Sequence, residues 1–250
     1  MQNELVQYTL RLGDNALILG QRLTEWCGHG PILEQDIALS NMALDQLGQA
    51  RMLLQYAAQL KGEGSTEDAL AFFRQEGEFR NLLLLELENG DWGKTIARQF
   101  LFDTFNYFQY TALLQSEDET LRAIAQKAIK EVTYHAQWSA EWVIRLGDGT
   151  DESHKRIQEA VDSLWEWANE MFVADAVDEL MLEKGIGVNL TEIHALWEEK
   201  VAQVLAMATL QMPAETWAQT GGKQGDHTES LGFLLAEMQS LPRTYPEAKW

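Results

Sequence analysis

Proline is absent from a long central part of the chain. The only prolines are at positions 31, 213, 242 and 246, so residues 32–212 contain none. Proline interrupts helices, whereas the turns of β-proteins use it freely. Glycines divide the chain instead, and they lie in residues 28–30, 62–64, 90, 147–149 and 185–187. The segments between them are roughly 20 to 30 residues long, as in helical bundles. The sequence therefore predicts a mostly helical body.

Apolar residues recur at spacings of three and four along four of these segments. Such a spacing places them on one face of a helix. The four segments are residues 5–26, 39–60, 96–114 and 121–146. Further helices are predicted near 153–183, 190–211 and 228–241, and the second of these follows a capping-box-like Asn189 and Glu192. Strand-like alternation is nowhere sustained, and no repeat or linker divides the chain. We therefore expect an all-α fold in one domain, residues 1–250.

Charge and composition exclude several classes of protein. The 250 residues include 39 Asp and Glu against 19 Lys and Arg, which gives a net charge of −20, and 46 % of residues are apolar. An apolar core can form, but nucleic acid and anionic membranes would repel such a chain. Cys27, the single cysteine, excludes an internal disulfide framework. The sequence contains no stretch apolar enough to span a membrane, and its first residues lack the cationic region of a secretory signal. We therefore expect a cytoplasmic protein with no membrane or nucleic-acid partner.

A few polar residues interrupt the apolar faces. Gln46 and Gln49 lie one turn apart in the second segment, and Asp103 is the only charged residue between positions 98 and 117. His135 lies on the apolar face of the fourth segment, and Glu25 lies near the end of the first. Burial of a carboxylate costs several kcal/mol unless it is paired, so these residues require an explanation.

The spacing of these residues matches that of a di-iron carboxylate bundle. Such a bundle takes one carboxylate from each of two helices and a Glu-x-x-His pair from each of the other two. The corresponding positions here are Glu25, Gln46, Gln49, Asp103, Val132 and His135. Three of the six lack the required donor, because the first pair consists of neutral amides and the second has valine for glutamate. Two carboxylates and one imidazole cannot ligate and neutralise two irons as four carboxylates and two imidazoles do.

Motifs along the whole chain resemble one family. They include Tyr-Thr-Leu-Arg-Leu-Gly-Asp-Asn at 8–15, Glu-Trp-Cys-Gly-His at 25–29, Thr-Gly-Gly-Lys at 220–223 and His-Thr-Glu at 227–229. The chain is similar to the structural C subunit of bacterial phenylacetyl-coenzyme A epoxidase. In the related catalytic subunits the first ligand pair resembles Asp-Glu-x-Gly-His, where this chain has Asp-Gln-Leu-Gly-Gln at 45–49. The second resembles Lys-Glu-Glu-x-x-His, where this chain has Lys-Glu-Val-Thr-Tyr-His at 130–135.

The resemblance implies a ferritin-like four-helix bundle core with additional C-terminal helices. It also implies a non-catalytic, structural subunit of a monooxygenase that epoxidises the aromatic ring of phenylacetyl-CoA with O₂ and NADPH. The expected partners are a catalytic di-iron A subunit, in an A2C2 complex or a multiple of it, a small B subunit and a reductase subunit. No metal-ligand role carries over to Gln46, Gln49 or Val132, so no cofactor is expected in this chain, and the six positions are interpreted as a vestigial metal site.

Three interpretations of individual residues stay open. Glu25, Asp103, His135 and the two amides could form one hydrogen-bonded cluster in place of the metal. A metal could instead use a register shifted by one residue, with Asp45, Glu131 and His135, although this places the first two beside the apolar face. The segment Gly221, Gly222 and Lys223 is most simply a structural turn, and a contact to another subunit or to the nucleotide end of coenzyme A is the alternative.

Two other functions are compatible with the sequence. One is a ferritin-like oxidase that binds metal through a non-standard ligand set, and iron analysis would distinguish it. The other is a self-assembling helical scaffold, which would form a stable homodimer without any partner.

Overall fold

A computed structural model of the chain describes residues 2–214 and 217–248. Over these residues the structure consists of helices and the turns that join them, with no β-strand, which confirms the all-α prediction. The chain divides into two compact units, one formed by residues 1–88 and 221–250 and the other by residues 89–220. The expected single domain over residues 1–250 stays a prediction.

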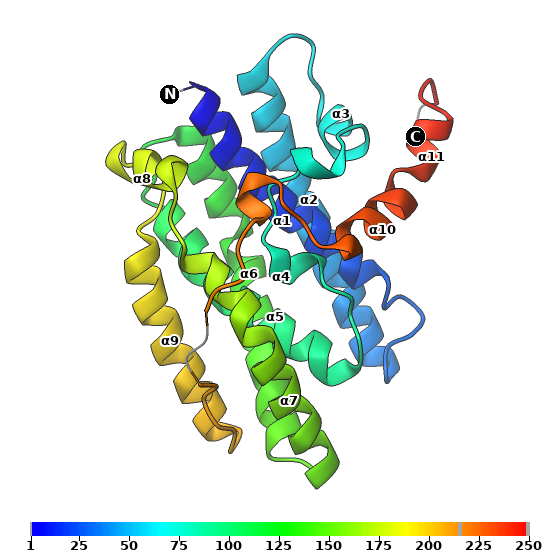
Figure 1. Cartoon of the computed structure of the whole chain (residues 1–250), viewed down its shortest axis with the longest axis vertical. Helices are drawn as coiled ribbons and strands as arrows, with labels where there is room; N and C mark the ends of the chain where they lie inside the picture. Colours follow the sequence, from blue (N-terminus) through cyan, green and yellow to red (C-terminus); the bar gives the residue numbers. More distant parts are fainter. Residues whose placement is uncertain (1, 215–216, 249–250) are drawn as a thin grey trace. The chain divides into compact units, whose positions relative to one another are not determined.

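The first unit is built on two long helices, α1 (Gln2–Thr24) and α2 (Leu33–Lys61) (Figure 1). They are antiparallel, because Gly13 approaches Leu54 while Gly20 approaches Leu47. A Cβ at either glycine would lie 3.0–3.1 Å from the facing leucine, so the small residues let the two helices pack closely. The remaining elements are α3 (Glu67–Phe72), η1 (Glu76–Glu78), α4 (Leu83–Glu86), η3 (Gly222–Gln224), α10 (Glu229–Met238) and α11 (Ser240–Thr244).

The second unit is built around α5 (Trp92–Leu113), which is buried on all sides over residues 95–106. Four further helices surround or follow it: α6 (Glu119–Gly147), α7 (Asp151–Ala168), α8 (Ala176–Glu183) and α9 (Leu190–Met207), with η2 (Asn169–Phe172) after α7. The helices α6, α7 and α9 all contact α5. Trp197 of α9 is fully buried, and its indole nitrogen donates a hydrogen bond to the backbone oxygen of Leu101 at 2.8 Å.

Side-chain caps explain where several helices begin. Asp91, Asp118 and Asn189 accept hydrogen bonds from backbone amides in the first turns of α5, α6 and α9. The cap predicted at Asn189 is therefore confirmed. The single helix predicted near 153–183 is wrong. The chain leaves the helical conformation after Phe172, and Asp175 begins α8 by accepting from the amides of Val177 and Asp178.

Candidate functional site

The two amide side chains of the predicted vestigial site lie in the first unit. Gln46 and Gln49 are one turn apart on α2, and each is 1 % exposed. A Cβ placed on Gly20 of α1 would lie 3.3 Å from the Cβ of Gln46, so these two residues are level along the helix pair. Neutral amides here supply neither the negative charge nor the basic nitrogen that iron takes from carboxylates and imidazoles.

The expectation that Glu25 is buried is wrong, while its place in a hydrogen-bonded cluster stays a prediction. The helix α1 ends at Thr24, and the Glu25 carboxylate pairs with Arg22 at 2.7 Å, with its side chain 34 % exposed. At a rise of about 1.5 Å per residue, Glu25 lies about 7 Å beyond Gly20, which is the residue level with Gln46. Glu25 is therefore a surface carboxylate that neutralises a neighbouring arginine.

Asp103 and His135 lie close together in the second unit, on α5 and α6. Both are 1 % exposed. Burial raises the pKa of Asp103 from 3.8 to about 6, although the nearby His135, Ser139 and Arg98 act in the opposite direction. The Ser139 hydroxyl donates a hydrogen bond to the backbone oxygen of His135 at 2.9 Å. Among the described residues, neither carboxylate oxygen of Asp103 has a hydrogen bond of ordinary geometry. Asp103 is therefore a buried acid that its surroundings compensate poorly.

The donor groups present do not fit a di-iron centre. Val132, one turn before His135, is fully buried and has no ligating atom. Asp45 and Glu131, which the shifted register would use, are only half-buried. Within either unit, no group of three or more His, Cys, Asp or Glu side chains among the described residues is arranged to hold a metal ion. With Glu25 at the surface, Asp103 is the one buried carboxylate at the six positions.

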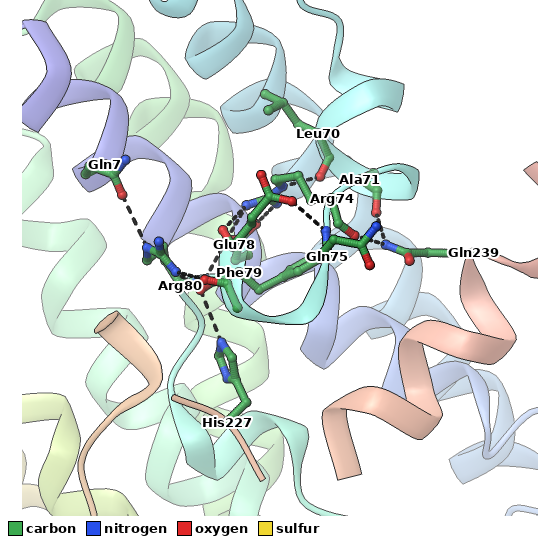
Figure 2. A network of polar contacts seen from close by, with 12 residues as sticks. Gln7, Leu70, Ala71, Arg74, Gln75, Glu78, Phe79, Arg80, His227 and Gln239 are labelled. Carbon is green, nitrogen blue, oxygen red and sulfur yellow. Dashed lines mark hydrogen bonds and ion pairs between the residues drawn. The ribbon is translucent and has the colours of Figure 1, made fainter. Parts of the chain in front are cut away.

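Sequence reasoning missed the main buried polar network, which lies in the first unit. Its centre is Asp14 of α1, which is fully buried. Both terminal nitrogens of Arg74 donate to this carboxylate, and the backbone amide of Arg80 does so at 2.9 Å. The guanidinium of Arg74 also lies 4.2 Å from the centre of the Phe79 ring. Figure 2 shows the neighbouring contacts, with Gln239 reaching the backbone oxygens of residues 71 and 74.

A second buried ion pair joins α4 to the C-terminal segment. Nδ1 of His227 lies 2.8 Å from a Glu86 carboxylate oxygen, and Nε2 lies 3.1 Å from the backbone oxygen of Phe79. Both ring nitrogens therefore face acceptors, and both are satisfied only when the ring is an imidazolium. Burial alone would lower the pKa of His227, but the hydrogen bond and charge of Glu86 outweigh it, so the pKa is raised. Glu86 also accepts from Asn81 and from the backbone amide of Thr228.

The glycine-rich segment before α10 packs on the chain from η1 to the start of α4. Gly221 and Gly222 are buried, and a Cβ on Gly222 would lie 2.1 Å from the backbone oxygen of Asn81. Gly225 has a φ of +92°, and a Cβ there would lie 2.3 Å from the backbone oxygen of Gly77. These contacts support the structural-turn interpretation for the two buried glycines. A contact of Lys223 with coenzyme A or another subunit stays a prediction.

Comparison with known proteins shows the family. A family model described as phenylacetic acid catabolic protein matches residues 1–250. The chain belongs to this family. It is 51 % identical, over 248 residues, to the C subunit of the 1,2-phenylacetyl-CoA epoxidase of Escherichia coli (strain K12), and the match covers 99 % of this chain and 100 % of that protein. The resemblance inferred from the motifs is therefore confirmed.

Membership of the phenylacetic acid catabolic protein family also agrees with the observed fold. The family has a ferritin-like all-α fold, and each unit here contains a long pair of sequential helices, α1 with α2 and α5 with α6. Among residues 2–214 and 217–248, no helix is both long enough and apolar enough to cross a membrane.

Proposed function

We propose that this chain is the non-catalytic C subunit of a multicomponent di-iron monooxygenase that epoxidises the aromatic ring of phenylacetyl-CoA. The observation that carries the proposal is 51 % identity along the whole length of a protein named as the C subunit of this epoxidase. In the proposed complex, the di-iron centre belongs to a related A subunit, and a reductase subunit brings electrons from NADPH. A small B subunit completes the cytoplasmic assembly that serves aerobic phenylacetate catabolism.

The chemistry of the buried positions supports a non-catalytic role. Gln46 and Gln49 replace a carboxylate and an imidazole, and Val132 replaces a second carboxylate. The side chains that remain on α5 and α6 leave one poorly compensated acid beside one histidine. We therefore propose that the chain carries no cofactor and that its six positions are a vestigial metal site.

The physical role of such a chain is to stabilise and orient the A subunit. Two related helical bundles associate well because each buries on the other the apolar surface that its own core leaves uncovered. An A2C2 assembly, or a multiple of it, would repeat this contact by symmetry.

Metal analysis of the purified chain, alone and in complex with its A subunit, tests the proposal. We expect essentially no iron in the chain alone and about two irons per A subunit in the complex, since a di-iron site takes two. About two irons bound to the isolated chain would instead support an oxidase with a non-standard ligand set. A stable homodimer that does not associate with any A subunit would support a self-assembling scaffold.

A further inference from the structure

The helix α2 has apolar side chains on two faces. One face is buried and includes Leu39, Met42 and Leu53, which are at most 1 % exposed. On the other face Leu33, Ile37 and Leu44 are 72 %, 51 % and 66 % exposed. A surface helix ordinarily has one apolar face and one polar face. The second apolar face of α2 therefore requires a partner that covers it.

The spacing of the exposed face identifies the kind of element that covers it. The exposed face follows the a and d positions of a heptad repeat, which alternate at spacings of three and four residues. Apolar residues fill four of these positions, and Ser40 fills the fifth: the four are Leu33, Ile37, Leu44 and the half-buried Leu47. We call these four apolar residues the α2 seam. A 3.5-residue repeat is complementary to another helix that packs nearly parallel or antiparallel to the first. The α2 seam runs over 14 residues, or about 21 Å of helix.

The surroundings of the α2 seam allow close approach by such a helix. Gly48, next to Leu47, is exposed, and no atom lies within 4 Å of the position that its Cβ would occupy. Leu47 also lines a groove of about 810 Å³ between α2, α3 and the C-terminal segment, whose wall includes Phe73, Leu241 and Tyr245. These three side chains are 43 %, 51 % and 57 % exposed. At its C-terminal end the seam therefore continues into an open groove, whose mainly apolar wall also includes the charged residues Arg51, Glu67 and Asp68.

Charge decides between a second copy and a different chain. Between residues 33 and 47 there are three acidic residues, Glu34, Asp36 and Asp45, and no lysine or arginine. Two copies packed seam to seam would bring acidic flanks together, and each whole chain carries a charge of −20. Like charges across an interface disfavour association. The complementary partner is a helix with apolar a and d residues and basic flanking residues.

We propose that the α2 seam is the docking surface for such a basic-flanked helix of the catalytic A subunit. The proposal rests on the proposed function, because that function supplies the A subunit as the partner. It adds which helix of this chain makes the contact, the heptad geometry of the contact and the sign of charge on the partner helix.

The test measures the affinity of the full-length chain for its own A subunit by titration calorimetry. The variants are Ile37→Glu, Leu44→Glu and the double variant, with Leu182→Glu and Leu196→Glu in α8 and α9 as matched controls. The two control leucines are 43 % and 48 % exposed. Because all four positions are exposed, every variant should keep the far-UV circular dichroism spectrum and melting temperature of the wild type. We expect the double variant to weaken binding about 100-fold or more, as for central apolar contacts of an interface, and each control to change it less than about twofold.

A charge variant tests the second part of the proposal. Glu34→Lys with Asp45→Lys places cations beside the seam, and we expect it to weaken binding to the A subunit at low salt and less so at high salt. Unchanged or tighter binding would show that the flanks of the partner helix are not basic and would overturn that assignment.

The outcomes separate this inference from the proposed function. If the wild type binds the A subunit and the Ile37→Glu, Leu44→Glu double variant binds equally well, the docking surface is wrong while the proposed function stands. If the wild type does not bind the A subunit at all, the proposed function itself fails. If the isolated chain forms a dimer that the double variant dissociates, the seam binds a second copy, and the inference is overturned.

Discussion

Buried charges in the two units are compensated to very different degrees. Asp14 receives both terminal nitrogens of Arg74 and a backbone amide, and Glu86 receives His227, Asn81 and a backbone amide. Asp103 has no comparable set of donors, and its pKa is raised to about 6. In the first unit, removal of one partner would therefore leave an uncompensated buried charge, whereas Asp103 already costs the second unit stability once it is ionised.

The substitution Asp103→Asn should stabilise the protein at neutral pH. The carboxyl of Asp103 has a pKa of about 6 in the folded chain, compared with 3.8 as its ordinary value in the unfolded chain. Proton binding by this carboxyl therefore stabilises the folded state below pH 3.8, and this stabilisation is lost as the pH rises to about 6. A neutral amide removes the penalty, so the variant should be about 2 to 3 kcal/mol more stable than the wild type at pH 7 and nearly equal to it near pH 4. Urea unfolding at both pH values measures the difference. An equal difference at pH 4 and pH 7 would contradict the assignment.

The substitution Glu86→Ala should destabilise the protein strongly. It leaves the His227 imidazolium buried without its carboxylate, which costs about 3 to 5 kcal/mol. Because the folded pKa of His227 is raised, the pair stabilises the fold fully below the unfolded value of 6.5, and this contribution is lost as the pH rises through the folded pKa. The effect of the variant should therefore be larger at pH 6 than at pH 9 in thermal unfolding.

Glu88→Ala provides the matched control for that experiment. Glu88 lies two residues further along the chain and is exposed. Its removal should change stability by less than about 0.5 kcal/mol at either pH. A comparable loss in both variants would show that the effect comes from net charge and not from the buried pair.

At the scale of elements, the short segment that contains η3 depends on close backbone contact. The turn at 221–225 packs on residues 77–83 only because it contains glycines, two of which would place a Cβ 2.1 to 2.3 Å from a backbone oxygen. Helices such as α1 and α2 tolerate larger residues at most positions because their side chains point away from the backbone.

The substitution Gly222→Ala should destabilise the chain by about 1 to 3 kcal/mol, because backbone must move to admit the methyl group. Gly48→Ala is the control. Gly48 lies inside α2 with open space around it, so alanine should stabilise the isolated chain by about 0.5 to 1 kcal/mol. Denaturant unfolding of both variants measures these opposite effects. Stabilisation by Gly222→Ala would show that the turn does not pack as described.

At the scale of the whole molecule, the first unit is discontinuous in sequence. Residues 221–250 return to residues 1–88 after the entire second unit. Arg22 donates to the backbone oxygens of Glu86 and Ser230, and Arg243 donates to that of Arg74. The first unit is therefore complete only when the last part of the chain has been synthesised.

Removal of residues 221–250 should reduce the protection of backbone amides in the first unit against hydrogen exchange. The truncated chain loses His227, Gln239 and the buried leucines of α10, so Glu86 is left without its imidazolium. We expect faster amide hydrogen exchange in α1 to α4 by mass spectrometry. A chain that ends at residue 245 keeps these contacts and should exchange like the full chain. Unchanged protection in the chain that ends at residue 220 would contradict the prediction.

Sequence periodicity was sufficient to predict the long helices and which side chains lie on their buried faces. A helical face repeats every three to four residues, so Gln46, Gln49 and Val132 could be assigned to buried faces from local sequence alone. The structure confirms that these three are buried. The heptad spacing on the exposed side of α2 is also present in the sequence. Only the structure shows that these side chains are exposed, and their exposure is what indicates a partner.

Only the tertiary structure decided which charges are buried and what compensates them. Glu25 and Asp14 both lie in or near the first helix, yet one is at the surface and the other is fully buried. The partners of the buried carboxylates are 60 residues away for Asp14 and 141 residues away for Glu86. Local patterns carry no information about pairs at such separations, because these pairs form only when the chain folds back on itself.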